Sequence, residues 1–234
     1  MISHTGKTQV CIAVGYDSRI TSPAFCEAVV KGITSTGHDA VVTGLSTTPS
    51  MFTLLKDEKA MAQQYCHGSI MITASHLPFN RNGLKFFSHN GCLEGSDVKE
   101  LLELAANYRF AEPTKTGKIT SIHYLNDYAA NLVEKVRVAT GEETPLQGKK
   151  IIVDAGNGAG GFFVDKVLMP LGADTQGSQF STPTALSLTI SLTPKMRRQS
   201  IPFARRLKTF KPISVSSLTL TSTKQVLLIT RARR

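Results

Sequence analysis

The sequence contains no tryptophan, no long apolar run and no pair of cysteines at CxxC spacing. Because a membrane-spanning helix needs about 18 or more apolar residues, no membrane partner is predicted. The start MISHTGKTQ lacks the basic and apolar segments of a signal peptide, which predicts a cytoplasmic location. The cysteines are therefore expected to be free thiols rather than a disulfide framework or a zinc site: Cys11, Cys26, Cys66 and Cys92.

Acidic residues are absent from the last part of the chain. Residues 181–234 hold 11 Lys and Arg and no acid, whereas residues 1–180 hold 16 Lys and Arg and all 17 Asp and Glu. The net charge of +10 therefore comes from a basic tail. This tail has 17 serines and threonines but no glycine or asparagine, which predicts disorder. One alternative function follows from its charge, a non-enzymatic protein that binds nucleic acid through the tail.

Along the rest of the chain, short apolar runs alternate with segments whose apolar residues recur at helical spacing. Residues 9–14, the run AVVTGL and residues 68–73 predict strands, while residues 22–35 and 95–107 predict helices. The stretch TTPSMFTLLKDEKA predicts one further helix, with Pro49 in its first turn. A new strand, glycine turn and helix begins at Lys149. The predicted fold class is α/β, a mixed or parallel sheet with helices on both faces, followed by an incomplete second α/β domain.

The stretch MITASHLPFNRNGLKFF, residues 71–87, places a polar loop after the third predicted strand. Ligands of α/β sheets bind at the carboxyl ends of strands, so Ser75 lies where a ligand is expected. An isolated loop serine is more often a turn former that bonds its own backbone. Here, however, the surrounding side chains are donors suited to an anion, above all phosphate: His76, Arg81, Asn82 and Lys85.

This loop resembles the active-site loop of the α-D-phosphohexomutases, the phosphomannomutase and phosphoglucomutase superfamily, whose pattern is close to T(A/G)SHNPxxxNGxK. VGYDSR, GLSTTPSMF and VDAGNGAGG resemble further family segments in the same order. Leu77 departs from the pattern, since many members have asparagine there. The resemblance implies domain I over residues 1–112, shortened at its N-terminus, a linker over 113–122, the start of domain II over 123–180 and the tail over 181–234.

The resemblance also implies an activity, the transfer of phosphate between C1 and C6 of a hexose phosphate, mannose or glucose phosphate, through a phosphoserine. Ser75 would carry the phosphoryl group, His76 would shape its loop, and Lys85 would be the phosphate clamp or acid–base helper. Three further residues would bind the substrate: Arg19, Thr73 and Asn82. Mg²⁺ would bridge the phosphoserine at Ser75 to aspartates of a later DxDxD loop. No nucleic-acid partner is expected.

The tail contains no DxDxD, but its codons allow one in the neighbouring frame. Joining the third base of each codon to the first two of the next allows FPNHIPNPE between Leu186 and Lys195, and ADLGxIFDTDVD between Lys211 and Thr223. Both strings resemble second-domain segments of the family, and the latter resembles its metal loop. We hypothesise a one-base frameshift near Phe180. The chain as written is expected to be inactive, because the metal loop and the later domains are missing.

GNGAGG supports a second alternative, an NAD(P)-dependent oxidoreductase. Gly156, Gly158 and Gly161 satisfy GxGxxG after a predicted strand, and Asp174 stands roughly where a ribose-binding acid would lie. No strand is predicted directly before Asp174. The same glycines would also allow a tight strand-to-helix turn without any dinucleotide.

Overall fold

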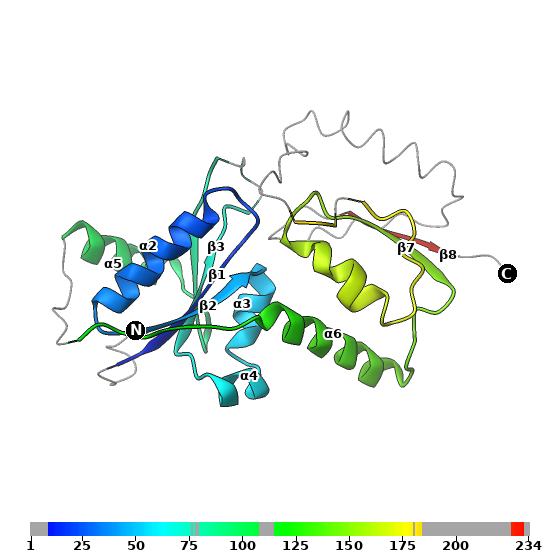
Figure 1. Ribbon diagram of the computed structural model, residues 1–234, viewed down its shortest axis with the longest axis horizontal. Coiled ribbons are helices and arrows are strands. Elements are labelled where there is room, and N and C mark those ends of the chain that lie inside the picture. Colours follow the sequence, from blue (N-terminus) through cyan, green and yellow to red (C-terminus); the bar gives the residue numbers. More distant parts are fainter. Residues whose placement is uncertain are drawn as a thin grey trace. The chain divides into compact units, whose positions relative to one another are not determined.

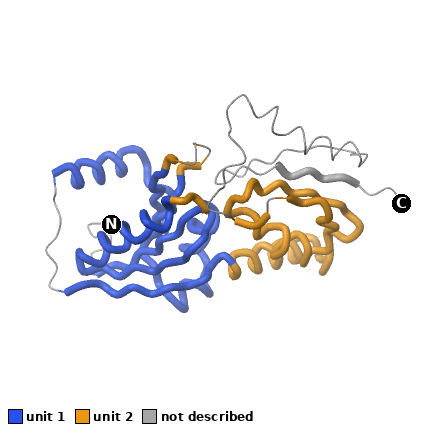
Figure 2. The backbone as a smooth tube through the Cα atoms, turned by 45° about the horizontal axis from the view of Figure 1, so that its top comes forward, with its two compact units in different colours: residues 1–17, 21–73, 82–125 blue, residues 18–20, 74–81, 126–234 orange. Residues whose placement is uncertain are grey.

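The computed structural model describes residues 9–75, 77, 80–107, 115–179 and 181–183, and the backbone of residues 226–231. These residues fall into two compact units, coloured separately in Figure 2. Unit 1 comprises Met1–Asp17, Thr21–Thr73 and Asn82–Leu125. Unit 2 comprises Asn126–Arg234 and two short loop segments, Ser18–Ile20 and Ala74–Arg81.

A six-stranded mixed sheet forms the centre of unit 1, in the order β5-β4-β3-β1-β2-β6. Its strands are β1 (Cys11–Tyr16), β2 (Asp39–Leu45), β3 (Gly68–Ile72), β4 (Leu84–Ser88), β5 (Gly91–Cys92) and β6 (Ile119–Ser121). The strands β3, β1, β2 and β6 run parallel, and β4 and β5 continue the sheet antiparallel. β1 and β3 are buried almost throughout, as expected of continuous apolar runs in parallel strands.

Helices pack on both faces of this sheet (Figure 1), which confirms the predicted fold class of unit 1. On one face, α2 (Ser22–Ser35) buries Cys26 and Val30 against the apolar side chains of β1 and β3. On the other face, the Ser69 hydroxyl of β3 donates to the Met51 carbonyl of α3 (Thr48–Leu54) at 2.7 Å. A Cβ at Gly15 would lie 2.6 Å from Met51 Sδ, so only glycine permits this close helix-to-strand packing.

The stretch predicted as one helix, TTPSMFTLLKDEKA, forms two. α3 ends at Leu54, and α4 (Glu58–Gln63) begins after Asp57. Asp57 Oδ1 accepts hydrogen bonds from the Lys59 and Ala60 N–H groups, both at 3.1 Å, and so caps the second helix. The prediction missed that an aspartate in an apparently continuous helix can start a new one.

β6 lies inside the segment predicted as a linker. Its neighbour Lys118 donates its N–H to Asp39 Oδ1 at 2.7 Å and accepts the Ala40 N–H at 2.9 Å, which fastens this segment to β2. Residues Ile119–Ser121 are all exposed, so no apolar pattern marked them as a strand. The linker predicted over 113–122 thus contains a strand of the sheet, and residues 108–114 lie outside the described part. After β5, α5 (Gly95–Ala106) forms as predicted.

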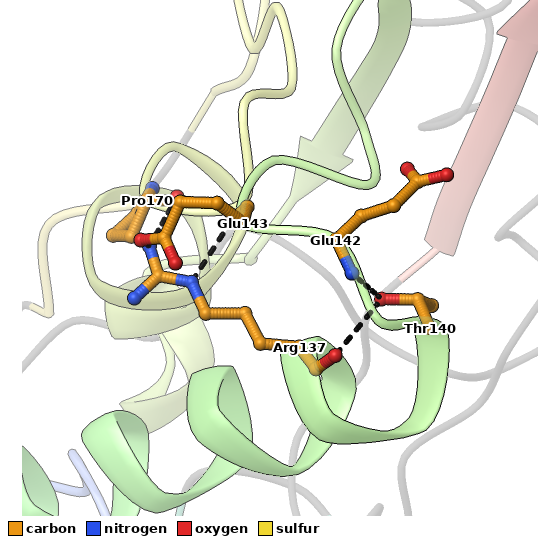
Figure 3. A network of polar contacts seen from close by, with 5 residues as sticks. All are labelled: Arg137, Thr140, Glu142, Glu143 and Pro170. Carbon is orange, nitrogen blue, oxygen red and sulfur yellow. Dashed lines mark hydrogen bonds and ion pairs between the residues drawn. The ribbon is translucent and has the colours of Figure 1, made fainter.

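Unit 2 contains the longer part of α6 (Tyr124–Thr140), then β7 (Lys149–Asp154), a short helical turn η1 (Ala159–Gly161) and η2 (Val164–Leu168). Ala129 and Val133 of α6 pack on Val167 and Leu171. The end of α6 is held by Arg137, which pairs with Glu143 Oε1 at 2.6 Å and donates to the Pro170 carbonyl at 3.1 Å (Figure 3).

The tail predicted as disordered is described at residues 181–183 and at the backbone of β8 (Val226–Arg231), which pairs antiparallel with β7. The sequence of this strand is the apolar run VLLIT followed by Arg231, and the prediction of disorder stays a prediction. The remainder of the prediction, residues 184–225 and 232–234, lies outside the described part. None of the helices that the structure describes is long and apolar enough to cross a membrane.

Candidate functional site

The carboxyl ends of β1 and β3 lie side by side at the point where the strand order of the sheet reverses. From β1 the chain passes through α2 to β2 on one side, then through α3 and α4 to β3 on the other side of β1. The two crossovers therefore leave from opposite faces of the sheet. At such a switch point the loops diverge and leave a crevice, which is the usual ligand site of an open α/β sheet.

A buried carboxylate joins these two strand ends. Asp17, which follows β1 and is only 4% exposed, accepts hydrogen bonds from the Thr73 hydroxyl at 2.7 Å and the Ser22 hydroxyl at 2.9 Å. Its N–H donates to the Ile72 carbonyl of β3 at 3.1 Å. Ser22 is the first residue of α2, so the carboxylate also lies at a helix N-terminus, where negative charge is stabilised. Asp17 thus connects β1, β3 and α2.

Asn82 adds a further connection within unit 1. Its amide Nδ2 donates to Ser22 Oγ and to Thr21 Oγ1, both at 3.2 Å. Thr73 also donates its N–H to the Gly83 carbonyl at 2.9 Å, which closes the base of the serine loop. Thr73 and Asn82, both predicted to bind substrate, therefore contact protein groups that hold the two ends of the loop.

Arg19 shapes the loop itself. The chain runs from Asp17 into the segment Ser18–Ile20, where Arg19 is only 8% exposed. Its Nη2 donates to the Ser75 carbonyl at 2.8 Å and the Leu77 carbonyl at 3.1 Å, and its Nη1 donates to the Arg81 carbonyl at 3.0 Å. The planar donor fork of arginine suits three carbonyls that curl around one point, which a lysine could not match.

The loop holds Ser75 in an unusual backbone conformation. Its φ is 53°, in the left-handed region that L-residues seldom adopt, and the residue is half-buried. For a non-glycine residue this conformation costs roughly 1–2 kcal/mol, so the hydrogen bonds of Arg19 and the turn formed by the Leu77 N–H and the Ala74 carbonyl, at 3.0 Å, have to hold it. Strained residues of this kind cluster at functional sites.

Of the other two residues predicted to be catalytic, the structure describes Lys85 but not His76. Lys85 lies on β4 opposite Met71, at the end of that strand where the serine loop returns to the sheet, and it is half-buried. His76 lies outside the described residues. No group of three His, Cys, Asp or Glu in the described part could hold a metal ion. The metal role predicted for Ser75 through a phosphoserine therefore stays a prediction, as do the roles of Lys85 and His76.

The sequence interpretation missed Asp17, although it used the VGYDSR motif that contains it. Asp17 and Thr73 are 56 residues apart in the chain, and their contact depends on β1 and β3 being neighbours. One signal could have suggested it: each residue follows a buried strand, and parallel strands on either side of a switch point bring such positions together.

The dinucleotide interpretation of GNGAGG fails on geometry. The glycines follow the carboxyl end of β7, where Gly156 and Asn157 have φ values of 53° and 57°. Asp174 lies at the other end of this strand, because it bridges to Lys150 and pairs with that side chain at 3.5 Å. Lys150 and Asp154 are four steps apart along the strand, about 13 Å, so Asp174 cannot reach a ribose held by the glycine turn.

The fold and the strained serine at the switch point define an α/β domain with a candidate ligand site at the carboxyl ends of its strands. Residues 1–112 match the family model described as phosphoglucomutase/phosphomannomutase, alpha/beta/alpha domain I. The chain belongs to the phosphohexomutase superfamily, through the N-terminal domain of that family.

Curated relatives agree with this assignment. The chain is 32% identical over 162 residues to a phosphoglucomutase of Neisseria gonorrhoeae, an alignment that covers 69% of this chain and 32% of the relative. It is 30% identical over 178 residues to a phosphoglucosamine mutase of Afipia carboxidovorans, covering 74% and 38%. The chain thus spans about a third of the length of the curated relatives it matches.

A solved structure shares the fold. A phosphoglucomutase/phosphomannomutase family protein from Burkholderia thailandensis superposes with a TM-score of 0.73 at 21% identity, over 86% of this chain and 42% of that protein. At this identity the likeness concerns the fold alone.

Proposed function

We propose that Ser75 is the phosphoryl carrier of a hexose-phosphate mutase, which moves phosphate between C1 and C6 of a hexose phosphate. The observation that carries the proposal is the left-handed conformation of Ser75, fixed at a strand end by a buried arginine. The relatives named phosphoglucomutase and phosphoglucosamine mutase support the substrate class, a sugar phosphate.

The contacts of the site suggest a division of roles among its residues. Arg19 donates to three loop carbonyls, so its role is to position Ser75, and the same holds for Thr73 and Asn82 at the base of the loop. Lys85 carries a positive charge at the start of β4 and is the residue we assign to the phosphate. A loop whose shape is set before binding loses little entropy when phosphate arrives, which favours transfer.

Magnesium dependence is what the superfamily implies in general. The acidic residue of the described site, Asp17, is already bonded by two hydroxyls, and the described residues contain no cluster that fits a metal ion. The described residues therefore do not form the Mg²⁺ site. Mg²⁺ would supply charge neutralisation of the transferring phosphoryl group in a complete enzyme.

The acidic ligands come, in this proposal, from the neighbouring reading frame of the tail. Residues 181–234 contain no carboxylate, whereas the shifted frame allows a DTDVD segment. The chain as written is then expected not to turn over, because loss of a charge-stabilising group costs about 3–4 kcal/mol of transition-state stabilisation. Sequencing the genomic DNA and the transcript across codon 180 tests this. The proposal is refuted if the DNA, translated in the shifted frame, does not encode a DxDxD segment.

The mutase assignment is tested on the frame-restored protein. Glucose 1-phosphate and mannose 1-phosphate are assayed in turn, each with a trace of the hexose 1,6-bisphosphate and Mg²⁺, and Ser75→Ala is the matched variant. We expect turnover that Ser75→Ala abolishes, and a phosphate label from the bisphosphate on the tryptic peptide of residues 60–81, which contains Ser75. Equal turnover by the Ser75→Ala variant would show that another residue carries the phosphate.

A further inference from the structure

Two cysteines lie together at the end of the sheet opposite the serine loop. Cys11 is the first residue of β1, and Cys66 comes two residues before β3. The backbone pairing of these strands extends to this point, since the His67 N–H donates to the Cys11 carbonyl at 2.7 Å and the Cys11 N–H donates to His67 Nδ1 at 3.0 Å. Cys11 is thus directly beside the residue that follows Cys66.

The side chain and backbone of one residue, Gln64, connect the two thiols. Gln64 Nε2 donates to Cys11 Sγ at 3.6 Å, and the Gln64 carbonyl accepts from Cys66 Sγ at 3.6 Å. Both cysteines are buried, at 7% and 0% exposure. By contrast, Cys26 of α2 packs among apolar core side chains, and Cys92 of β5 is exposed.

The two thiols differ in acidity. The hydrogen bond from Cys66 lowers the pKa of the Cys11 thiol, although burial opposes this. The neighbouring Cys11 side chain, together with burial, raises the pKa of the Cys66 thiol. Cys11 is therefore the thiol that ionises first, and the thiolate is the form that reacts with oxidants.

We propose that Cys11 and Cys66 form a site of reversible oxidative modification, closed as an intramolecular disulfide by a hydroperoxide. The Cys11 thiolate attacks one peroxide oxygen, the O–O bond breaks, and the alcohol or water leaves with the proton of the thiol. Cys11 is then a sulfenic acid. The Cys66 sulfur attacks the sulfur of Cys11, and the hydroxyl leaves as water with the proton of Cys66. Two thiols are oxidised, the peroxide is reduced, and an external dithiol reverses the reaction.

Such a bond would link β1 and β3 at their amino ends. The carboxyl ends of the same two strands carry Asp17 and Thr73, which hold the base of the serine loop. The modification site is separate from the proposed phosphoryl carrier and does not depend on it. A bridge from residue 11 to residue 66 restricts the unfolded chain, so oxidation should raise the melting temperature of the full chain.

The four cysteines fall in four different tryptic peptides, which makes the site easy to map. These peptides are residues 8–19, 60–81, 20–31 and 86–99, for Cys11, Cys66, Cys26 and Cys92 in turn. The full chain is treated with hydrogen peroxide in native buffer, alkylated with iodoacetamide in denaturant, reduced, and alkylated again with an isotope-labelled reagent. We expect the second label on Cys11 and Cys66 together, and a cross-linked pair of their peptides in the unreduced digest.

Cys26 is the matched control: it is also buried, and its pKa is raised by burial and by Glu27 rather than by another cysteine. The Cys26→Ser variant should cross-link as the parent chain does. The Cys66→Ser variant should stop at a sulfenic acid on Cys11 that dimedone traps, and the Cys92→Ser variant should cross-link as the parent chain does. The proposal is overturned if Cys11 and Cys66 keep the first label as Cys26 does, or if the bridge forms in urea but not in native buffer.

Discussion

Replacing Thr73 by valine removes one hydroxyl from a buried charged network and leaves the shape of the side chain nearly unchanged. Thr73 is 2% exposed, and its hydroxyl donates to the Asp17 carboxylate at 2.7 Å. A hydrogen bond to a charged group contributes about 1.5–3 kcal/mol, more than a neutral one. Thr73→Ser keeps the hydroxyl and loses one methyl group, which costs only about 0.8 kcal/mol.

We therefore expect Thr73→Val to lower the free energy of unfolding of unit 1 by about 1.5–3 kcal/mol, and Thr73→Ser by about 1 kcal/mol or less. In melting temperature the valine variant should lose roughly 3–12 °C, using about 2–4 °C per kcal/mol for a chain of this size. In an Asp17→Asn background the valine substitution should cost about 1 kcal/mol less, because the acceptor no longer carries charge.

The chain has two units, so a probe specific to unit 1 is needed. Amide hydrogen exchange, followed by mass spectrometry on peptides that cover β1 and β3, reports the opening free energy of those strands. Tyrosine emission and circular dichroism during urea unfolding give the global value, since the chain has no tryptophan. If β1 and β3 have the same opening free energy in the Thr73→Val and Thr73→Ser variants, the hydrogen bond to Asp17 does not stabilise the switch point and the reasoning fails.

Three further predictions concern single positions. Because Ser75 has a φ of 53°, Ser75→Gly should be about 1 kcal/mol more stable than Ser75→Ala in urea unfolding, although both lose the proposed phosphoryl acceptor; equal stability would contradict the strain. A Cβ at Gly117 would lie 1.8 Å from the His38 carbonyl oxygen, so Gly117→Ala should destabilise unit 1 by roughly 1–3 kcal/mol, whereas Gly32→Ala, with open space in α2, should stabilise it by roughly 0.5–1 kcal/mol in the same melts. Burial raises the pKa of Tyr128 above its usual 10.0, so the folded state disfavours the phenolate and stability falls as pH rises above about 10; Tyr128→Phe should flatten this fall in urea midpoints measured from about pH 9 to 11.

The sequence was informative where local pattern and tertiary structure agree. α2 has the predicted bounds, Ser22–Ser35, because its apolar spacing matches the face it buries and Pro23 suits its first turn. The serine loop was recognisable because its polar side chains interrupt two apolar strands. The break between α3 and α4 was not predicted, since propensity alone does not tell a capping Asp57 from a helical one.

The arrangement around the serine needed the structure. Arg19 was predicted to bind substrate, and its three carbonyl partners depend on how residues 75–81 curl, which no periodicity specifies. The left-handed conformation of Ser75 was equally hidden, because sequence rules expect glycine or asparagine at such a φ. Asp17 was missed because its partner Thr73 is near it only through the order of the strands.

A phosphoryl group on Ser75 would bring a charge of about −2 to this loop at neutral pH. The guanidinium of Arg19 already directs donors at three carbonyls, and the Asp17 carboxylate at the base of the loop is an acceptor that cannot neutralise phosphate. The described contacts therefore orient the serine more than they compensate the charge it would carry. Stabilising the transferring phosphate then requires cations beyond these contacts, Lys85 and the metal site that we place in the neighbouring reading frame. On this reasoning, restoring the frame should raise turnover far more than any substitution within residues 9–107.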